Sequence, residues 1–209
     1  FHRHSVAAGG CGLYVFRYNT VLNNIAASGG HAIDTHEARK KGGGNTYGTR
    51  AVEVYNNKLI NTMYTYGALI KKGQRVGMAS LETAGIAIRA GEAVVYNNEV
   101  KGYRYAVRLS NWYLGGTPQP YPVLYGPGYL SGKAFGPDHK GTQSSMGDGD
   151  VFIWNNKVSP FLEDEWNSFP SFDNEEPDWW KEGRDYHFVP KPGYKAYPYP
   201  YPIHKKYIE

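Results

Sequence analysis

The sequence predicts an all-β fold in which the chain winds as a parallel β-solenoid. A short strand repeat occurs four times, and a second strand pattern returns after 19 residues, from Ile88 to Val107. The segments between repeats differ in length, which a solenoid tolerates because each repeat contacts only its neighbours and insertions become loops. Strand pairs joined by two-residue hairpin turns, which an antiparallel sandwich requires, do not stand out in the sequence.

Four copies of one strand define the repeat. They are Val15–Asn19, Val52–Asn56, Ala93–Asn97 and Val151–Asn155. Each copy ends in an aromatic residue followed by Asn, and the Asn positions are 37, 41 and 58 residues apart. An apolar residue follows each Asn after three places, at Leu22, Leu59, Val100 and Val158. The repeated unit is therefore constant, whereas the connecting loops vary.

Alternation along these strands predicts which side chains face inward. The predicted inward column begins with Val15, Val52, Ala93 and Val151, and Arg17 interrupts the next inward column. The outward aromatic column is Tyr18, Tyr55, Tyr96 and Trp154. We expect this column to stabilise the sheet by stacking. The Asn residues that follow tolerate left-handed backbone, so they are expected to end each strand at a bend and to form a hydrogen-bonded ladder.

A second strand pattern supplies the other wall of the predicted solenoid. Its copies span 32–36, 87–91 and 106–110. In this alignment the outward column carries Asp34, Arg89 and Arg108. The two Arg residues would lie on neighbouring coils, about 4.8 Å apart. Like charges at that distance are unfavourable unless an anion lies between them.

Composition limits the classes of function. The chain has 209 residues, enough for one domain, with 41% apolar and 20% charged residues. It has no apolar run long enough to span a membrane, and its net charge of +4 comes without a basic block, so neither a membrane span nor nucleic acid is predicted. Cys11 is the only cysteine, which excludes an internal disulfide. The chain starts at Phe1 without a leader sequence, so we expect N-terminal coils to be missing.

The predicted organisation has two parts. Residues 1–160 form the coils, and residues 161–209, rich in aromatic residues and Pro, form an irregular C-terminal cap or strap packed on the helix. Three long loops leave the coils, at 37–50, 62–84 and 111–150. Insertions that share one edge of a solenoid usually build its binding face.

The repeats are similar to the coils of right-handed parallel β-helix proteins of the pectate-lyase-like superfamily. The similarity lies in the phrases YVFRYNTVLNN, AVEVYNNKLIN and GEAVVYNNEVKG. The tail resembles the closing segment of a group of secreted bacterial β-helix proteins, in GRDYHFVPKPGYKAYPYPYP. This resemblance implies a right-handed parallel β-helix, a secreted or cell-surface location and an acidic polysaccharide as partner.

The resemblance leaves the activity open, because the superfamily includes lyases, hydrolases, epimerases, phage tailspikes and adhesins. We expect a carbohydrate-active protein that cleaves an acidic polysaccharide by β-elimination. The alternative is a non-catalytic module that recognises a polysaccharide, as an adhesin or a phage tailspike does.

Charged and aromatic residues around the second strand pattern form the predicted site. His36 lies on the same outward face as Asp34, and Glu37 follows at the mouth of the loop. If residues 1–4 are a further copy, His2 stacks on Asp34 and His4 stacks on His36. The predicted substrate-binding residues are His2, His4, Asp34, Glu37, Tyr105 and Trp112.

The resemblance also suggests roles for these residues. In a lyase of this kind an Arg or Lys removes the proton next to a uronate carboxylate, and Ca²⁺ held by acidic residues neutralises that carboxylate. This assigns proton abstraction to Arg89 or Arg108 and a Ca²⁺ ligand to Asp34. His36 would also suit a general base near neutral pH.

Two alternatives remain open for the same residues. His2 and His4, together with Asp34 and His36, would suit Zn²⁺ or another transition metal. An Asp–Arg column that only balances surface charge is the structural alternative.

Overall fold

The structure is a computed structural model of the chain. It describes residues 4–8, 13–23, 30–35, 49–61, 70–71, 74–75, 84–88, 91–103, 105–109, 151–159, 171–172, 182–183 and 186–198. These residues form β-strands and connecting turns, and none of them lies in a helix. The strands are β1 (His4–Ala8), β2 (Leu13–Arg17), β3 (Thr20–Asn23), β4 (His31–Thr35), β5 (Thr49–Tyr55), β6 (Lys58–Asn61), β7 (Ile70–Lys71), β8 (Gln74–Arg75), β9 (Ala84–Ile88), β10 (Gly91–Tyr96), β11 (Glu99–Lys101), β12 (Tyr105–Leu109), β13 (Val151–Trp154), β14 (Lys157–Ser159), β15 (Ser171–Phe172) and β16 (Tyr186–His187).

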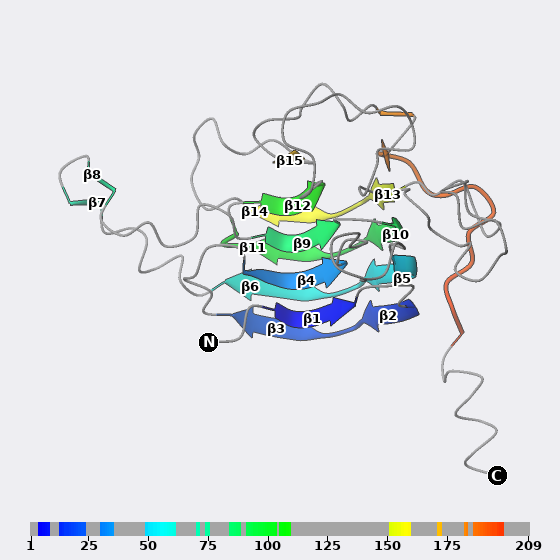
Figure 1. The fold of residues 1–209 in the computed structure, drawn as a ribbon, viewed down its shortest axis with the longest axis horizontal. Helices are drawn as coiled ribbons and strands as arrows, with labels where there is room; N and C mark the ends of the chain where they lie inside the picture. Colours follow the sequence, from blue (N-terminus) through cyan, green and yellow to red (C-terminus); the bar gives the residue numbers. More distant parts are fainter. Residues whose placement is uncertain are drawn as a thin grey trace, which may run out of the picture.

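Three parallel sheets make up the body of the fold (Figure 1). Sheet A has the order β1-β4-β9-β12-β15, sheet B has β16-β13-β10-β5-β2, and sheet C has β14-β11-β6-β3. One strand of each sheet forms a layer, so that β1, β2 and β3 make the first of four layers. Strands β7 and β8 form a separate antiparallel pair. The prediction of an all-β fold with parallel sheets is confirmed, and the layers are consistent with a β-solenoid.

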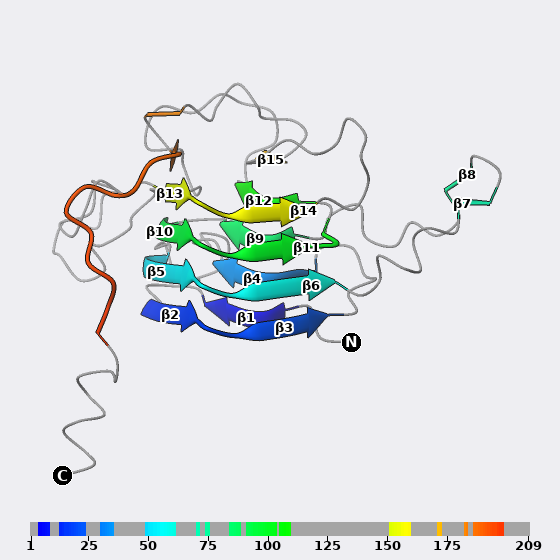
Figure 2. The same ribbon diagram turned by 180° about the vertical axis from the view of Figure 1, so that it is seen from behind.

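The core lies between sheet A and the two other sheets. Sheet B bends directly into sheet C, and sheet A lies behind both (Figure 2). The buried side chains in the middle are mostly aliphatic; the largest include Ile33, Ile86, Leu59, Val54, Val95 and Ile153. Burying one such side chain stabilises the fold by roughly 1.5–3 kcal/mol. Stacked aliphatic columns therefore hold the sheets together.

The first repeat lies one residue away from its predicted register. Tyr14 pairs with Val52, and Phe16 packs against the core, so the inward positions are not Val15 and Arg17. Arg17 instead pairs with Tyr55 in the outward column, in the place predicted for Tyr18. The same shift pairs Val21 with Leu59 and leaves Leu22 66% exposed, so Leu22 is not the equivalent of Leu59 with which it was aligned.

The backbone at the bend explains this shift. Tyr18, Asn56, Asn97 and Asn155 all have left-handed φ angles, between 52° and 57°. Asn adopts this region more readily than most residues, but in the first repeat a Tyr occupies it. Aligning the first repeat with the others by their shared aromatic–Asn pair therefore places the first repeat one residue out of register.

An asparagine ladder runs through the layers, one residue after the left-handed position. It consists of Asn19, Asn57, Asn98 and Asn156. In each step the Oδ1 atom of one Asn accepts hydrogen bonds from the backbone N–H and the Nδ2 atom of the Asn in the preceding layer, at 2.9–3.2 Å. A ladder was predicted one position earlier in the later repeats. Of its members, Asn19 belongs to the observed ladder, and Asn155 donates to Asn97 at 2.5 Å outside it.

Sheet A also differs from its predicted alignment. Ile33 pairs with Ile86, and Asp34 pairs with Ala87, which in turn pairs with Arg108. The predicted placement of Arg89 between Asp34 and Arg108 is therefore wrong, and Arg89 itself lies outside the described residues. Because Ile, Ala and Ile follow one another at 86–88, a shift of two residues preserves the apolar pattern.

Part of the C-terminal tail lies along the outer face of sheet B. Strand β16 pairs with β13, and the chain then runs down beside the sheet (Figure 1). The Tyr194 hydroxyl donates to Glu53 Oε2 at 2.8 Å, and its ring contacts Tyr96 and Trp154 edge-on. Residues 186–198 thus cover part of the aromatic column. The predicted boundary at residue 160 stays a prediction.

Candidate functional site

The outer face of sheet A carries the described residues of the predicted site. Ala32 and Ile33 are neighbours in sequence, yet both belong to the core, so strict alternation is interrupted at this point. As a result, His31 and Asp34 lie on the same side, where both are close to His4. Arg108 lies over the ring of Tyr105 on the same sheet. We call His4, His31, Asp34, Tyr105 and Arg108 the sheet A cluster.

An imidazole–carboxylate pair lies at one end of the sheet A cluster. The Nε2 atom of His4 is 3.4 Å from the Oδ2 atom of Asp34. The Asp34 side chain is fully buried, whereas the His4 side chain keeps 16% of its surface exposed. The carboxylate fixes the orientation of the His4 ring, whose Nδ1 atom is also buried.

A second histidine supports this pair. The rings of His4 and His31 stack with their centroids 5.5 Å apart. The backbone N–H of Ala84 donates to Nδ1 of His31 at 3.2 Å. Since Nδ1 accepts this bond, the proton of the neutral His31 ring lies on Nε2. His31 is therefore held in one tautomer as a platform for the His4 ring.

Arg108 is the cation at the other end. Its guanidinium carbon lies 5.2 Å from the centroid of the Tyr105 ring, a cation–π contact. Tyr105 is buried, and Arg108 is half-buried. Asp34 and Arg108 are in the same register position two layers apart, which corresponds to about 9.6 Å between their backbones. The cluster thus holds its half-buried cation away from the buried carboxylate.

Four predicted site residues lie in this cluster: His4, Asp34, Tyr105 and Arg108. The other predicted residues, His2, His36, Glu37, Arg89 and Trp112, lie outside the described residues. The partners predicted for His4 are corrected, because its strand pairs it with His31 and not with His36. His4 also takes the position beside Asp34 that was predicted for His2.

Sequence reasoning missed two residues near Asp34. His31 lies three residues before Asp34, but the alignment began at Ala32 and left it out. Tyr14 points into the core, and its hydroxyl has no hydrogen-bond partner in the part of the chain that the structure describes. Burial, and to a lesser extent the charge of Asp34, raises the pKa of Tyr14, so it is a neutral phenol at ordinary pH. A polar residue at a shifted inward position left no sequence signal.

The described surroundings of Asp34 do not fit the predicted Ca²⁺. They supply one carboxylate and two imidazoles, whereas Ca²⁺ prefers roughly six to eight oxygen ligands. Among the residues that the structure describes, no group of three or more His, Cys, Asp or Glu side chains is arranged to hold a metal ion. We therefore derive no chemistry through a metal at this site.

No protein-family model, curated protein or solved structure matches the chain significantly. Within the described ranges, no helix is long and apolar enough to cross a membrane. The case for a function therefore rests on the side chains of the sheet A cluster.

Proposed function

We propose that this chain is a right-handed parallel β-helix protein, similar to the pectate-lyase-like superfamily and secreted or exposed at the cell surface. We further propose that it binds an acidic polysaccharide on the outer face of sheet A and cleaves it by β-elimination. The observation that carries the proposal is the pair of His4 Nε2 and Asp34 Oδ2 at 3.4 Å, on the sheet that also presents Arg108.

Each accessible member of the cluster has a distinct role in this proposal. Arg108, two layers from Asp34, binds the carboxylate of a neighbouring uronate in the polymer, because a guanidinium remains protonated and can donate two parallel hydrogen bonds to it. The Tyr105 ring restricts the position of the guanidinium. His4 is the general base. Its Nε2 atom faces Asp34, which positions the ring and stabilises the imidazolium that forms, so Nδ1 takes the proton and substrate binding has to expose this buried atom.

The elimination step follows from these roles. Neutral His4 removes the proton from the ring carbon next to the carboxylate. The electrons of that C–H bond form a C=C bond to the neighbouring carbon, whose bond to the glycosidic oxygen breaks. The leaving oxygen takes a proton from water. Arg108 holds the neighbouring uronate, and so keeps the reacting sugar beside His4 during this step.

Absorbance of the unsaturated uronate product in the ultraviolet tests this proposal. Polygalacturonate, alginate and hyaluronan are the substrates, and the matched variants are His4→Ala and Arg108→Ala. Lys157→Ala is the control, because Lys157 is an exposed cation on sheet C. We expect absorbance to rise with the unaltered chain and with the control. The rate of this rise should be lower by roughly a hundredfold or more in either site variant. A rise that both variants retain would overturn the assignment of the site.

A non-catalytic polysaccharide-binding module is the second candidate. Most of the described outer face of sheet A is buried, including Asp34, Ala84, Ala87 and Tyr105. Arg108 is its partly accessible cation and His4 is partly accessible beside Asp34, which favours a small cationic contact over an enclosed reaction cleft. Binding of a uronate polymer that Arg108→Ala weakens, without any ultraviolet product signal, would select this candidate.

A further inference from the structure

A second surface lies where sheet B bends into sheet C, on the side of the molecule away from sheet A (Figure 2). An open pocket of about 470 Å³ occupies this bend. Its lining includes Tyr18, Asn56 and Asn97 at the bend, and Thr20, Lys58 and Glu99 at the start of sheet C. We call this pocket the bend groove. It spans three successive layers and shares no residue with the sheet A cluster.

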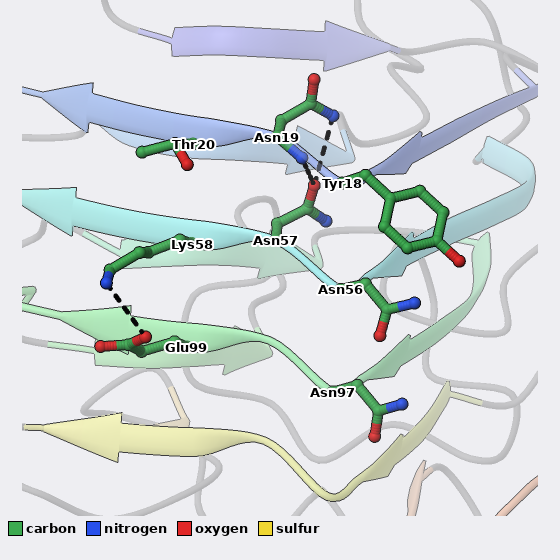
Figure 3. A pocket seen from close by; sticks show the side chains of 8 residues that line it. All are labelled: Tyr18, Asn19, Thr20, Asn56, Asn57, Lys58, Asn97 and Glu99. Atoms are coloured by element: carbon green, nitrogen blue, oxygen red, sulfur yellow. Dashed lines mark hydrogen bonds and ion pairs between the residues drawn. The ribbon is translucent and has the colours of Figure 1, made fainter.

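Left-handed backbone directs a column of side chains into the bend groove. The φ angles are 57° at Tyr18, 55° at Asn56 and 54° at Asn97. Figure 3 shows the two amides one above the other, pointing to the same side as the Tyr18 ring. Tyr18 is 73% exposed, so an aromatic surface is available beside the amides. Each of the three layers therefore contributes one projecting side chain.

The amides of the bend groove retain hydrogen-bonding capacity. The neighbouring asparagines Asn57 and Asn98 use their amides in the internal ladder. In contrast, the Asn56 side chain has no hydrogen-bond partner among the described residues, and Asn97 accepts a bond from Asn155 at 2.5 Å but donates none there. A free amide offers both a donor and an acceptor, which suits the adjacent hydroxyls of a sugar.

The charges of the bend groove cancel. Lys58 Nζ lies 3.4 Å from Glu99 Oε2, and Figure 3 shows this ion pair across sheet C. The pair is exposed, so it adds little stability, but it leaves the groove without net charge. A neutral, hydroxyl-rich ligand therefore fits this surface better than the anionic polymer proposed for sheet A.

The spacing of the layers suggests how such a ligand would lie. Neighbouring parallel strands are about 4.8 Å apart. This distance is close to the length of one pyranose unit in an extended glycan. A glycan lying along the stack would therefore meet Tyr18, Asn56 and Asn97 with successive sugars. Tyr18 would stack on one sugar face, and the two amides would bond hydroxyls of the next two.

We propose that the bend groove binds an extended, neutral polysaccharide chain along the axis of the stack, with one sugar for each layer. This site is separate from the proposed acidic-polysaccharide site and needs none of its residues. It would allow the protein to hold a neutral glycan independently of any chemistry on sheet A.

Calorimetric titration of the full chain with β-1,4-glucan oligomers tests the proposal. Cellobiose, cellotriose and cellohexaose are the probes, maltohexaose is the coiled neutral comparator, and trigalacturonate is the anionic one. We expect affinity to rise roughly tenfold from cellobiose to cellotriose, because the third sugar reaches the third layer, and to change little beyond it. Maltohexaose and trigalacturonate are expected to bind more weakly than cellotriose.

The matched variants are Asn56→Gly and Asn97→Gly, because Gly adopts left-handed backbone without strain and removes only the amide. Each should lower cellotriose affinity by roughly tenfold. Lys157→Ala is the control, since Lys157 is exposed on sheet C in the fourth layer and does not line the pocket. Absence of cellohexaose binding, equal binding by all three variants, or competition by trigalacturonate would overturn the proposal. We expect His4→Ala to bind cellotriose as the unaltered chain does. This result would show that binding in the bend groove does not depend on the proposed site on sheet A.

Discussion

His4 and Asp34 lie three positions apart in the register of sheet A, yet their side chains approach to 3.4 Å. His4 pairs with His31, and the interruption of alternation at Ala32 and Ile33 turns His31 and Asp34 toward the same side. The pair therefore depends on the local course of strand β4. It brings an imidazole and a buried carboxylate together from two neighbouring layers.

The asparagine ladder is predicted to be a main source of stability. Asn98 is buried, and its Oδ1 atom accepts bonds from both the backbone N–H and Nδ2 of Asn57. Its Nδ2 atom donates to the carbonyl of Val54 at 2.9 Å. Asn98→Ala leaves several of these buried groups without partners, so the free energy of unfolding should fall by at least about 2 kcal/mol. Urea denaturation measures this change.

Thr20→Ala is the control for the ladder prediction, because Thr20 is exposed on sheet C at the first layer. It should change the free energy of unfolding by less than about 0.5 kcal/mol. A loss for Asn98→Ala no larger than that of the control would show that the ladder does not stabilise the protein.

Gly85 is predicted to admit no larger residue. A Cβ atom there would lie 2.5 Å from Cγ1 of Val100 and 3.0 Å from the carbonyl oxygen of Ala106. Gly85→Ala should therefore lower the free energy of unfolding by roughly 1–3 kcal/mol through overpacking. The double variant with Val100→Ala removes the nearest clash, so its loss should be smaller than the sum of the two single losses. Thermal denaturation of the four chains gives this cycle, and simple additivity would contradict the packing shown.

Alkaline pH is predicted to release the tail from sheet B. Burial and hydrogen bonds with Tyr96 and Glu53 raise the pKa of Tyr194 above its ordinary value of 10.0. A raised pKa means that the folded state favours the neutral phenol, so this contribution is fully present below pH 10.0 and is lost as the pH rises above it. Limited proteolysis of residues 186–198 across this range should show cleavage increasing above pH 10.0.

Tyr194→Phe is the matched variant for the tail. It keeps the ring contacts with Tyr96 and Trp154 but has no hydroxyl to donate to Glu53 or to ionise. Its cleavage at neutral pH should exceed that of the unaltered chain, and the difference between the two should shrink as the pH rises. A difference that stays constant across the range would rule out Tyr194 as the titrating anchor.

The sequence predicted the parallel sheets because the same strand and bend recur with loops of different length. It did not predict the register of the first repeat, since Tyr18 takes the left-handed position that Asn takes elsewhere. Register in sheet A was ambiguous because the Ile–Ala–Ile run at 86–88 looks the same after a shift of two residues. The Val100 side chain explains why position 85 is a glycine, where the neighbouring strands have Ala32 and Ala106. That contact cannot be inferred from one strand alone.

The residues of the candidate site were also predicted only in part. The outward column correctly joined Asp34 and Arg108, because both follow an inward apolar residue in their strands. It misplaced His4 and omitted His31, since their contacts depend on the interruption of alternation in strand β4. Local deviations of this kind have no period and therefore leave no pattern in the sequence.

Binding of uronate oligomers by Arg108→Ala tests the central proposal most directly. Titration with trigalacturonate, trimannuronate and a hyaluronan hexasaccharide compares the unaltered chain, Arg108→Ala and the control Lys157→Ala at equal ionic strength. We predict that at least one oligomer binds, that Arg108→Ala weakens it by roughly tenfold or more, and that the control does not. Failure of all three oligomers to bind, or equal binding by Arg108→Ala and the control, would contradict an acidic-polysaccharide site on sheet A.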